Sequence, residues 1–384
     1  MALNIIVGGG FTYVPFSPGA AWTRLESALG LIKLGHNVLI VEEVGEGWCF
    51  DKSGARTTYE RSWSRELFSQ MMTQFGVMDQ ALQIFNAGEA TTGPALEAVT
   101  AFARDTDILI NNSGHIKLDS IMDAVKRRVY VDLDPVYTQL WYAEYGKLQS
   151  LDRHDVFFTV GANIGTERSE IPDCGRTWHH VNRIIDLDHW PSRYDPSCRD
   201  FTTIANWAGY GELQYGGKAF KPKYSEFMRF AELPRHVRQT FEISLKNYDP
   251  EDPRIRKLAA NGWSLRNATE QIDSLEKYRR YIATSRAEIG IAQSAYVQGH
   301  SGWFSDRSAH YLASGKPVLA QATGFEDHLR TGEGLIAFKT LEEAVHGIEE
   351  INGNYQRHCR AARDIAADCF DYRKVLPEML RIIM

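Results

Sequence analysis

Short apolar runs alternate with helical patterns from the first residues of the chain. Residues 4–7 are predicted as a short buried strand with three successive apolar residues, and a triple glycine follows at 8–10. Apolar side chains then recur at helical spacing over 22–32, and a second apolar run follows at 38–41. A strand, a helix and a strand in close succession are typical of a parallel β-α-β unit. The pattern therefore predicts an α/β protein built on a parallel sheet.

The same alternation continues to the C-terminus. Further strands are predicted at 107–110, 129–131, 156–160, 202–206, 241–245, 289–292 and 318–321. Helices are predicted at 65–75, 94–104, 225–230, 275–285, 306–313 and 341–351, and over a last segment that begins near 355. Thr340 with Glu343 has the spacing of a capping box at a helix start.

A polar segment rich in Pro, Cys and aromatic residues interrupts this alternation between 166 and 200. We place a domain boundary there, near residue 195. The prediction is two Rossmann-like α/β domains, 1–195 and 196–384, that face a central cleft. Many strands end in small, polar or acidic residues, and ligands of open α/β sheets bind at those carboxyl ends.

Composition narrows the function classes. Hydrophobic residues make up 43% and charged residues 24%, which excludes a mainly disordered chain. Lys and Arg number 43 against 49 Asp and Glu, and the net charge of −6 disfavours broad nucleic-acid binding without excluding a local basic patch. Five scattered cysteines without a Cys-x-x-Cys pair favour reduced thiols and a cytoplasmic protein. No apolar run approaches 18 residues, so no membrane span is expected, and the first residues do not resemble a signal peptide.

The strongest local signal lies in residues 301–325. A Ser/Gly-rich loop leads into a helix for which Ser305 is the expected N-cap, and a glycine loop follows the next strand. A helix N-terminus with unpaired N–H groups and a nearby guanidinium favours a bound phosphate. An ordinary helix cap beside an ordinary turn is the alternative. The candidate anion-binding residues are Ser301, Gly302, Ser305, Asp306, Arg307, Ser308, Thr323, Gly324 and Phe325.

The following stretch resembles a known family. Gly315, Lys316, Pro317, Val318, Gly324, Glu326, Gly332 and Gly334 have the order and spacing of the nucleotide-sugar-binding half of GT-B-fold glycosyltransferases. The triple-glycine loop and the helix and strand after it also resemble the start of the acceptor domain in that fold. The resemblance implies that 1–195 binds the acceptor and 196–384 binds the donor, with the last helix able to pack back on the first domain.

The resemblance also implies donor-site roles. Retaining members carry a second acid in the helix before the Gly-Lys-Pro turn, and this chain has none there. Asp306 is then the candidate for the ribose or a sugar hydroxyl, and Arg307 for the diphosphate. Lys246 would add a second positive charge. Gly9 and Gly10 would let the first domain approach the donor, and Trp207 would offer a ring face to it.

Two residues are candidates for the catalytic base that deprotonates the acceptor. His115 and Asp134 both follow predicted strands. We favour His115 slightly, because an ordinary histidine pKa of about 6.5 needs little tuning, although a loop histidine without a catalytic role is the simpler interpretation. Glu42 and Glu43 come next. Asp132 with Asp134 could instead hold a divalent metal, but the GT-B resemblance implies a site without one.

The predicted function is that of a glycosyltransferase. It would move a hexosyl or pentosyl group from a nucleoside diphosphate sugar to an acceptor hydroxyl or similar nucleophile, with no cofactor besides the donor. A sugar-nucleotide epimerase of the same fold and a non-catalytic nucleotide-sugar-binding protein stay open. A dinucleotide oxidoreductase is weaker, because the first glycine loop lacks a G-x-G-x-x-G turn. The acceptor and the oligomeric state are not predicted.

Overall fold

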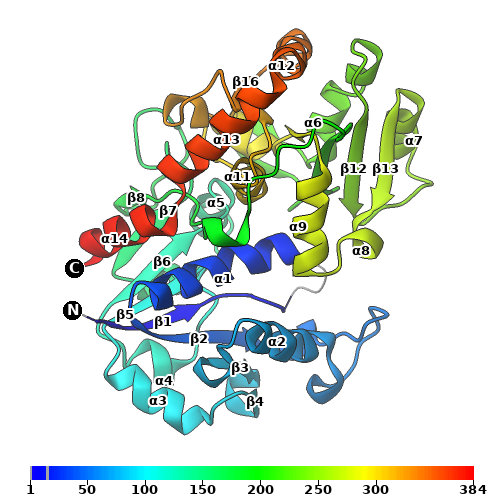
Figure 1. Cartoon of the computed structure of the whole chain (residues 1–384). Coiled ribbons are helices and arrows are strands. Elements are labelled where there is room, and N and C mark those ends of the chain that lie inside the picture. The colour runs from blue at the N-terminus through cyan, green and yellow to red at the C-terminus, as the bar shows by residue number, and fades with distance from the viewer. Residues whose placement is uncertain (1, 14–16) are drawn as a thin grey trace.

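Two parallel sheets organise the molecule (Figure 1). The computed structural model describes residues 2–13 and 17–384. The first sheet has eight strands in the order β4-β3-β2-β1-β5-β6-β7-β8, parallel except for the β3–β4 pair. The second has six parallel strands in the order β13-β12-β9-β14-β15-β16. These two Rossmann-like sheets confirm the predicted fold class.

The strands of the two sheets are divided by the segment that the sequence marks near residue 195. The first sheet comprises β1 (Asn4–Gly8), β2 (Asn37–Val44), β3 (Ala81–Phe85), β4 (Ala90–Thr92), β5 (Ile108–Asn112), β6 (Arg128–Asp132), β7 (Val156–Thr159) and β8 (Trp178–His180). The second comprises β9 (Phe201–Asn206), β12 (Phe241–Lys246), β13 (Trp263–Asn267), β14 (Ala287–Gly290), β15 (Val318–Gln321) and β16 (Leu335–Phe338). A separate hairpin pairs β10 (Leu213–Tyr215) with β11 (Lys218–Phe220).

Helices connect and cover these strands. In the first half they are α1 (Pro18–Lys33), α2 (Trp63–Gln74), α3 (Leu96–Arg104), α4 (Asp119–Met122) and α5 (Tyr137–Ala143). In the second half they are α6 (Tyr224–Arg229), α7 (Pro253–Ala260), α8 (Ala268–Gln271), α9 (Leu275–Thr284), α10 (Ser294–Gln298), α11 (Asp306–Ala313), α12 (Leu341–Gly353), α13 (Tyr355–Cys369) and α14 (Tyr372–Ile383).

Local sequence signals explain the elements that were predicted. Pro18 occupies the first turn of α1, where its missing N–H costs nothing, and Gly35 follows the helix with a positive φ of 87°. The capping box of α12 is confirmed, because Thr340 and Glu343 each accept a hydrogen bond from the other's backbone N–H. The prediction lacks the three-residue strands β4, β8, β10 and β11. It also lacks β3 and β13, because polar residues such as Gln83 and Arg266 interrupt their short apolar patterns.

The chain order reverses once in each sheet. β1 lies between β2 and β5, and β9 lies between β12 and β14. The carboxyl ends of strands at such a switch point form the usual ligand crevice of an open α/β sheet. Gly10, just after β1, and Asn206, the last residue of β9, line the same cleft. The two switch points therefore open toward each other.

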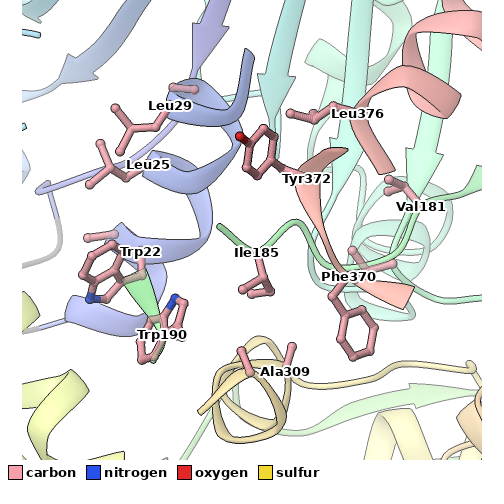
Figure 2. Close-up of a cluster of buried hydrophobic side chains, with 14 of the residues drawn as sticks. Trp22, Leu25, Leu29, Val181, Ile185, Trp190, Ala309, Phe370, Tyr372 and Leu376 are labelled. Atoms are coloured by element: carbon pink, nitrogen blue, oxygen red, sulfur yellow. The ribbon is translucent and has the colours of Figure 1, made fainter. Parts of the chain in front are cut away.

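One apolar core joins the two halves (Figure 2). Trp22 of α1 and Trp190 of the connecting segment lie with ring centroids 5.3 Å apart, and both side chains are buried. Ala309 of α11, from the second half, belongs to the same cluster. The connecting segment around Trp190 is thus packed between α1 of the first half and α11 of the second half.

The last helix, α14, returns to the first half and packs against α1 (Figure 1). A Cβ added at Gly30 of α1 would lie 2.8 Å from Leu376 and 3.0 Å from Tyr372. Helix α1 therefore approaches α14 as closely as a glycine allows. None of the helices that the structure describes has both the length and the apolar character needed to cross a membrane.

Replacing Leu376 by alanine is expected to lower the free energy of unfolding by about 2–5 kcal/mol, because its buried side chain fills the contact between α14 and α1. Urea unfolding followed by tryptophan fluorescence measures this loss. Arg381→Ala, whose side chain on the same helix is 71% exposed, is the control and should cost less than about 1 kcal/mol. Equal losses for the two variants would show that this contact does not stabilise the fold.

Candidate active site

A cleft of about 560 Å³ lies between the two halves of the molecule. Its lining comes from the carboxyl ends of β9, β12 and β13 and from the loops after β1 and β6, among other segments. The volume is in the range of small-molecule sites. Among the described residues that line it, the cations are Arg24, Lys223, Lys246 and Arg307, and the carboxylates are Asp134 and Asp306.

Arg307 lines the cleft, as predicted, but it is already held by the protein. Its Nε donates to Glu288 at 2.5 Å and its Nη1 donates to the Ile204 carbonyl at 2.6 Å. Glu288 is fully buried at the base of β14. The guanidinium is therefore fixed at one wall before any ligand arrives.

Lys223, which sequence analysis did not single out, adds a second cation close to Arg307. It follows the β10–β11 hairpin and is only 7% exposed. Within the described part of the chain it forms no ion pair with a carboxylate. Burial, followed by the charge of Arg307, lowers the pKa of Lys223 to about 7. A bound anion would relieve this cost, so Lys223 is poised to gain from a phosphate.

Asp306 occupies the first turn of α11 and faces the first half of the molecule. Its carboxylate accepts a hydrogen bond of 3.1 Å from the Thr23 hydroxyl of α1. Burial opposes its ionisation, but Arg183, His310 and Arg307 outweigh it and lower the pKa of Asp306 to about 2. The group is therefore an anion that can accept hydrogen bonds from ligand hydroxyls.

The first half contributes Arg24 and the glycine loop after β1. Arg24 Nη1 donates to the Ala20 carbonyl at 2.8 Å, while its Nε is buried without a partner among the described residues. Gly10 lines the cleft, and Gly9 lies beside Arg24, where an added Cβ would be 3.1 Å from the arginine Cδ. Lys246, at the end of β12, also lines the cleft and donates to the Ser17 hydroxyl at 2.8 Å.

Asp134 reaches the cleft through a strained turn. Val136, two residues later, has φ 73° and ψ −53°, a conformation that β-branched residues rarely adopt. Such strain costs about 1–3 kcal/mol and persists where the surroundings impose it, often at functional sites. The Tyr296 hydroxyl donates to the Asp134 carboxylate at 3.2 Å. Burial raises the pKa of Asp134, which makes it a stronger base than an exposed aspartate.

Asp132 holds this turn through hydrogen bonds. Its two carboxylate oxygens accept hydrogen bonds from Thr138 at 2.6 Å, Thr159 at 2.8 Å and Gln139 at 3.0 Å, and a further bond from the Asp134 N–H at 3.0 Å. No cluster of three or more His, Cys, Asp or Glu suited to a metal occurs among the residues that the structure describes. The two aspartates thus have separate roles.

His115, our preferred candidate for the base, is partly buried and does not line the cleft, and its Nε2 is buried without a partner among the described residues. Its ring centroid lies 4.9 Å from that of Tyr13, which stands on the cleft side. Burial, with a smaller effect of Arg24, lowers the pKa of His115 to about 3, so it is a weak base. Glu42 and Glu43 are also occupied: Glu42 accepts hydrogen bonds from Thr12 and Tyr13, and Glu43 accepts two from the backbone at 117–118.

Several predicted donor residues instead join the two halves behind the cleft. Asn163, after β7, donates its N–H to the Ser301 carbonyl at 3.0 Å. Gly302 donates its N–H to Thr323 and packs against this loop, where an added Cβ would lie 2.8 Å from the Asn163 nitrogen. Gly324 is closer still, and an added Cβ there would clash with the Asn163 side-chain amide. Ser301, Gly302 and Gly324 thus contact the first half at Asn163, whereas Thr323 bonds to Gly302 and Trp303 within the second half. None of these four residues lines the cleft.

Three further candidates, Trp207, Ser308 and Phe325, do not line the cleft. The buried Trp207 indole donates to Asp252 at 3.0 Å and packs against α6. Ser308 and Phe325 line a separate small cavity behind Arg307. The cleft itself is lined by Gly10, Asp134, Lys246, Ser305, Asp306 and Arg307 from the predicted set.

A buried polar contact fixes α11 against α1. Glu26 and His310 are both fully buried, and their Oε2 and Nε2 atoms lie 3.0 Å apart. The other Glu26 oxygen accepts a 2.6 Å hydrogen bond from the Trp190 indole, whose ring stacks on His310 at 4.3 Å. Tyr278 completes the network, with its hydroxyl 3.1 Å from His310 Nδ1. Glu26 and Thr23 share one face of α1, so this network and the Thr23–Asp306 bond act together.

The residues that sequence analysis missed had no local signal. Arg24 is one of many helical arginines, and Lys223 lies in an unremarkable GGKAFKPK segment. Arg183, buried between Asp306 and Asp134, follows a polar strand and donates to the Phe304 carbonyl at 2.8 Å. Each is identified by what surrounds it in space.

The overall architecture is shared with solved glycosyltransferases. An alpha-glucosyltransferase in complex with UDP aligns with a TM-score of 0.61 at 16% identity, covering 99% of this chain and 98% of that chain. The chain has the GT-B fold. An alpha-glucosyltransferase in complex with UDP-glucose and DNA containing an abasic site gives 0.58 at 14% identity, over 99% and 98% of the two chains. Anabaena Alr3699/HepE in complex with UDP-glucose gives 0.58 at 12% identity, over 98% of each chain. No protein-family model and no curated protein matches the sequence.

Glu26→Ala is expected to destabilise the protein by about 1–3 kcal/mol for each buried group that it leaves unpaired, the Trp190 indole among them. Glu26→Gln keeps an acceptor oxygen and nearly the same volume, so its loss should be clearly smaller. Urea unfolding of the two variants measures the difference. If both lose the same free energy, the hydrogen bonds of Glu26 do not carry the contact.

Proposed function

We propose that this protein is a glycosyltransferase that moves a hexosyl group from a nucleoside diphosphate sugar to an acceptor hydroxyl. The observation that carries the proposal is the charge of the cleft. Four cations and two carboxylates line it among the described residues, although the whole chain has a net charge of −6. A diphosphate is the ligand group that such a local excess of cations favours. The named complexes with UDP and UDP-glucose make UDP-glucose the first donor to test.

The donor would lie against the second half of the cleft. Arg307, Lys223 and the N-terminus of α11 would face the diphosphate, and Asp306 would accept hydrogen bonds from sugar or ribose hydroxyls. As the glycosidic bond breaks, negative charge grows on the leaving diphosphate. Fixed cations stabilise that charge more in the transition state than in the ground state, which accelerates the reaction. In this proposal the side chains of Arg307 and Lys223 stabilise the negative charge of the leaving diphosphate, and the protein needs no metal or other cofactor.

The acceptor would lie against the first half, beside Asp134. The acceptor oxygen forms a bond to the anomeric carbon, the bond from that carbon to the diphosphate breaks, and the nucleoside diphosphate leaves with the electron pair. Asp134 takes the acceptor proton and later releases it to solvent. Four of the structural neighbours are complexes with DNA. The acidic chain here argues against a polynucleotide acceptor. The five free thiols favour a cytoplasmic setting.

One incubation with radiolabelled UDP-glucose separates this function from its alternatives. Transfer to an acceptor, or slow hydrolysis to free glucose, supports a glycosyltransferase. Conversion to another UDP-sugar would indicate an epimerase, and binding without turnover would indicate a binding protein.

Lys223→Met is expected to weaken UDP binding at least tenfold, because a charge-assisted hydrogen bond contributes about 1.5–3 kcal/mol. With its pKa near 7, Lys223 is increasingly neutral in the free protein as pH rises from 7 to 9, so wild-type affinity should fall over that range with proton uptake on binding. Calorimetry in buffers of different ionisation enthalpy measures both the UDP affinity and the number of protons taken up on binding. Arg307 is a poorer probe, because its loss would leave Glu288 unpaired.

Lys221→Met is the matched control for this experiment, because Lys221 is exposed two residues away. It should leave UDP affinity and its pH dependence unchanged. If Lys223→Met behaves like the control, Lys223 does not contact the diphosphate.

Asp134→Asn is expected to lower turnover by about 10²–10⁴-fold with UDP affinity nearly unchanged, because it removes the base and not the donor site. His115→Asn should retain most of the turnover, since His115 does not line the cleft. Steady-state kinetics and calorimetry on the two variants provide the test. The reverse pattern would assign the base to His115.

A further inference from the structure

Aromatic side chains surround Asp134 in the cleft. Tyr13, Trp48, Tyr210, Tyr296 and Trp303 all line it together with this carboxylate. Trp48 and Tyr210 are 46% and 48% exposed, which is unusual for side chains of this size. They come from opposite halves of the molecule, so exposed rings stand on both sides of the cleft.

These rings are held in place by further aromatic contacts. Trp48 meets Tyr13 edge to face, with centroids 5.0 Å apart. Tyr210 lies 4.8 Å from Tyr137 and 5.1 Å from Trp141. Gly209 and Gly211 flank Tyr210 with positive φ values of 64° and 85°, a backbone path that favours glycine. The exposed rings of Trp48 and Tyr210 are therefore held in position by the aromatic side chains that pack against them.

The tyrosine hydroxyls of the cleft are largely committed to the protein. Tyr296 donates to Asp134 at 3.2 Å, and the Tyr278 hydroxyl lies 3.1 Å from His310. The Tyr296 ring stacks on Trp303 at 4.3 Å with an interplanar angle of 22°. What this part of the cleft offers a ligand is aromatic surface around the Asp134 carboxylate, with the Arg24 guanidinium also lining the cleft. A polyol would need several more hydrogen-bonding groups to replace those that it gives to water.

We infer that the acceptor is a small, uncharged molecule that carries its hydroxyl on a flat ring, with the ring against Trp48 and Tyr210 and the hydroxyl at Asp134. This inference rests on the proposed function. Stacking suits a flat ring, because aromatic faces prefer offset or edge-to-face contact with another π-system. The single carboxylate then receives the proton of the single reacting hydroxyl.

A matched pair of alcohols tests the inference with UDP-glucose as donor. 2-Naphthalenemethanol and its fully saturated counterpart, decahydro-2-naphthalenemethanol, present similar primary alcohols on a flat and on a puckered skeleton. The flat alcohol should have a kcat/KM at least tenfold higher, and free glucose should be a poor acceptor. Equal use of the two naphthalene-derived alcohols, or a preference for glucose, would overturn the inference.

Single substitutions test whether Trp48 and Tyr210 contact the acceptor. Trp48→Ala and Tyr210→Ala should each raise KM for 2-naphthalenemethanol roughly tenfold while UDP affinity by calorimetry changes less than twofold. Tyr194→Ala is the control, because Tyr194 is also 48% exposed but lies outside the cleft lining. Equal effects of all three variants would refute an aromatic acceptor site. Donor hydrolysis without transfer to the flat alcohol refutes this inference alone, whereas no UDP binding and no turnover refutes the proposed function as well.

Discussion

The buried contact between Glu26 and His310 sets the geometry on which the candidate site depends. It joins α1 of the first half to α11 of the second at 3.0 Å, with no exposed surface on either side chain. Both helices carry cleft residues close to this contact, Arg24 on α1 and Arg307 on α11. An unpaired buried polar group is costly, so the two groups hold each other at one spacing. That contact joins the two helices, and residues of both helices line the cleft.

The apolar core around this contact limits how the molecule can move. Trp22 and Trp190 pack together beneath it, and α14 ties the C-terminus to α1. A large rotation about the connecting segment would expose these side chains, which costs roughly 25 cal/mol for each Å² of apolar surface.

Positive charge and backbone strain are both concentrated at or near the cleft. The acidic residues that give the chain its net charge of −6 lie mostly elsewhere, while the cleft gathers Lys223, Arg307 and two further cations. The strained Val136 lies two residues after Asp134, and Asp132 anchors the turn by hydrogen bonds. The D-x-D pattern thus separates into an anchoring residue and a candidate base, a distinction that residue type alone does not contain.

The sequence by itself determined the two parallel sheets, the capping box of α12 and the presence of Asp306 and Arg307 at a helix start, because periodicity and capping act over a few residues. Only the tertiary structure decided which loops line the cleft. The loops at 301–302 and 323–324 have the composition of a phosphate site, yet the Gly302 N–H donates to the Thr323 carbonyl and the Gly324 N–H donates to the Glu326 carboxylate. Burial lowers the pKa of His115 to about 3, which makes it a weak base. Burial also lowers the pKa of Lys223 to about 7, so a bound anion would stabilise its charged form. Solvent exposure and long-range partners depend on residues more than a hundred positions apart, which no local pattern encodes.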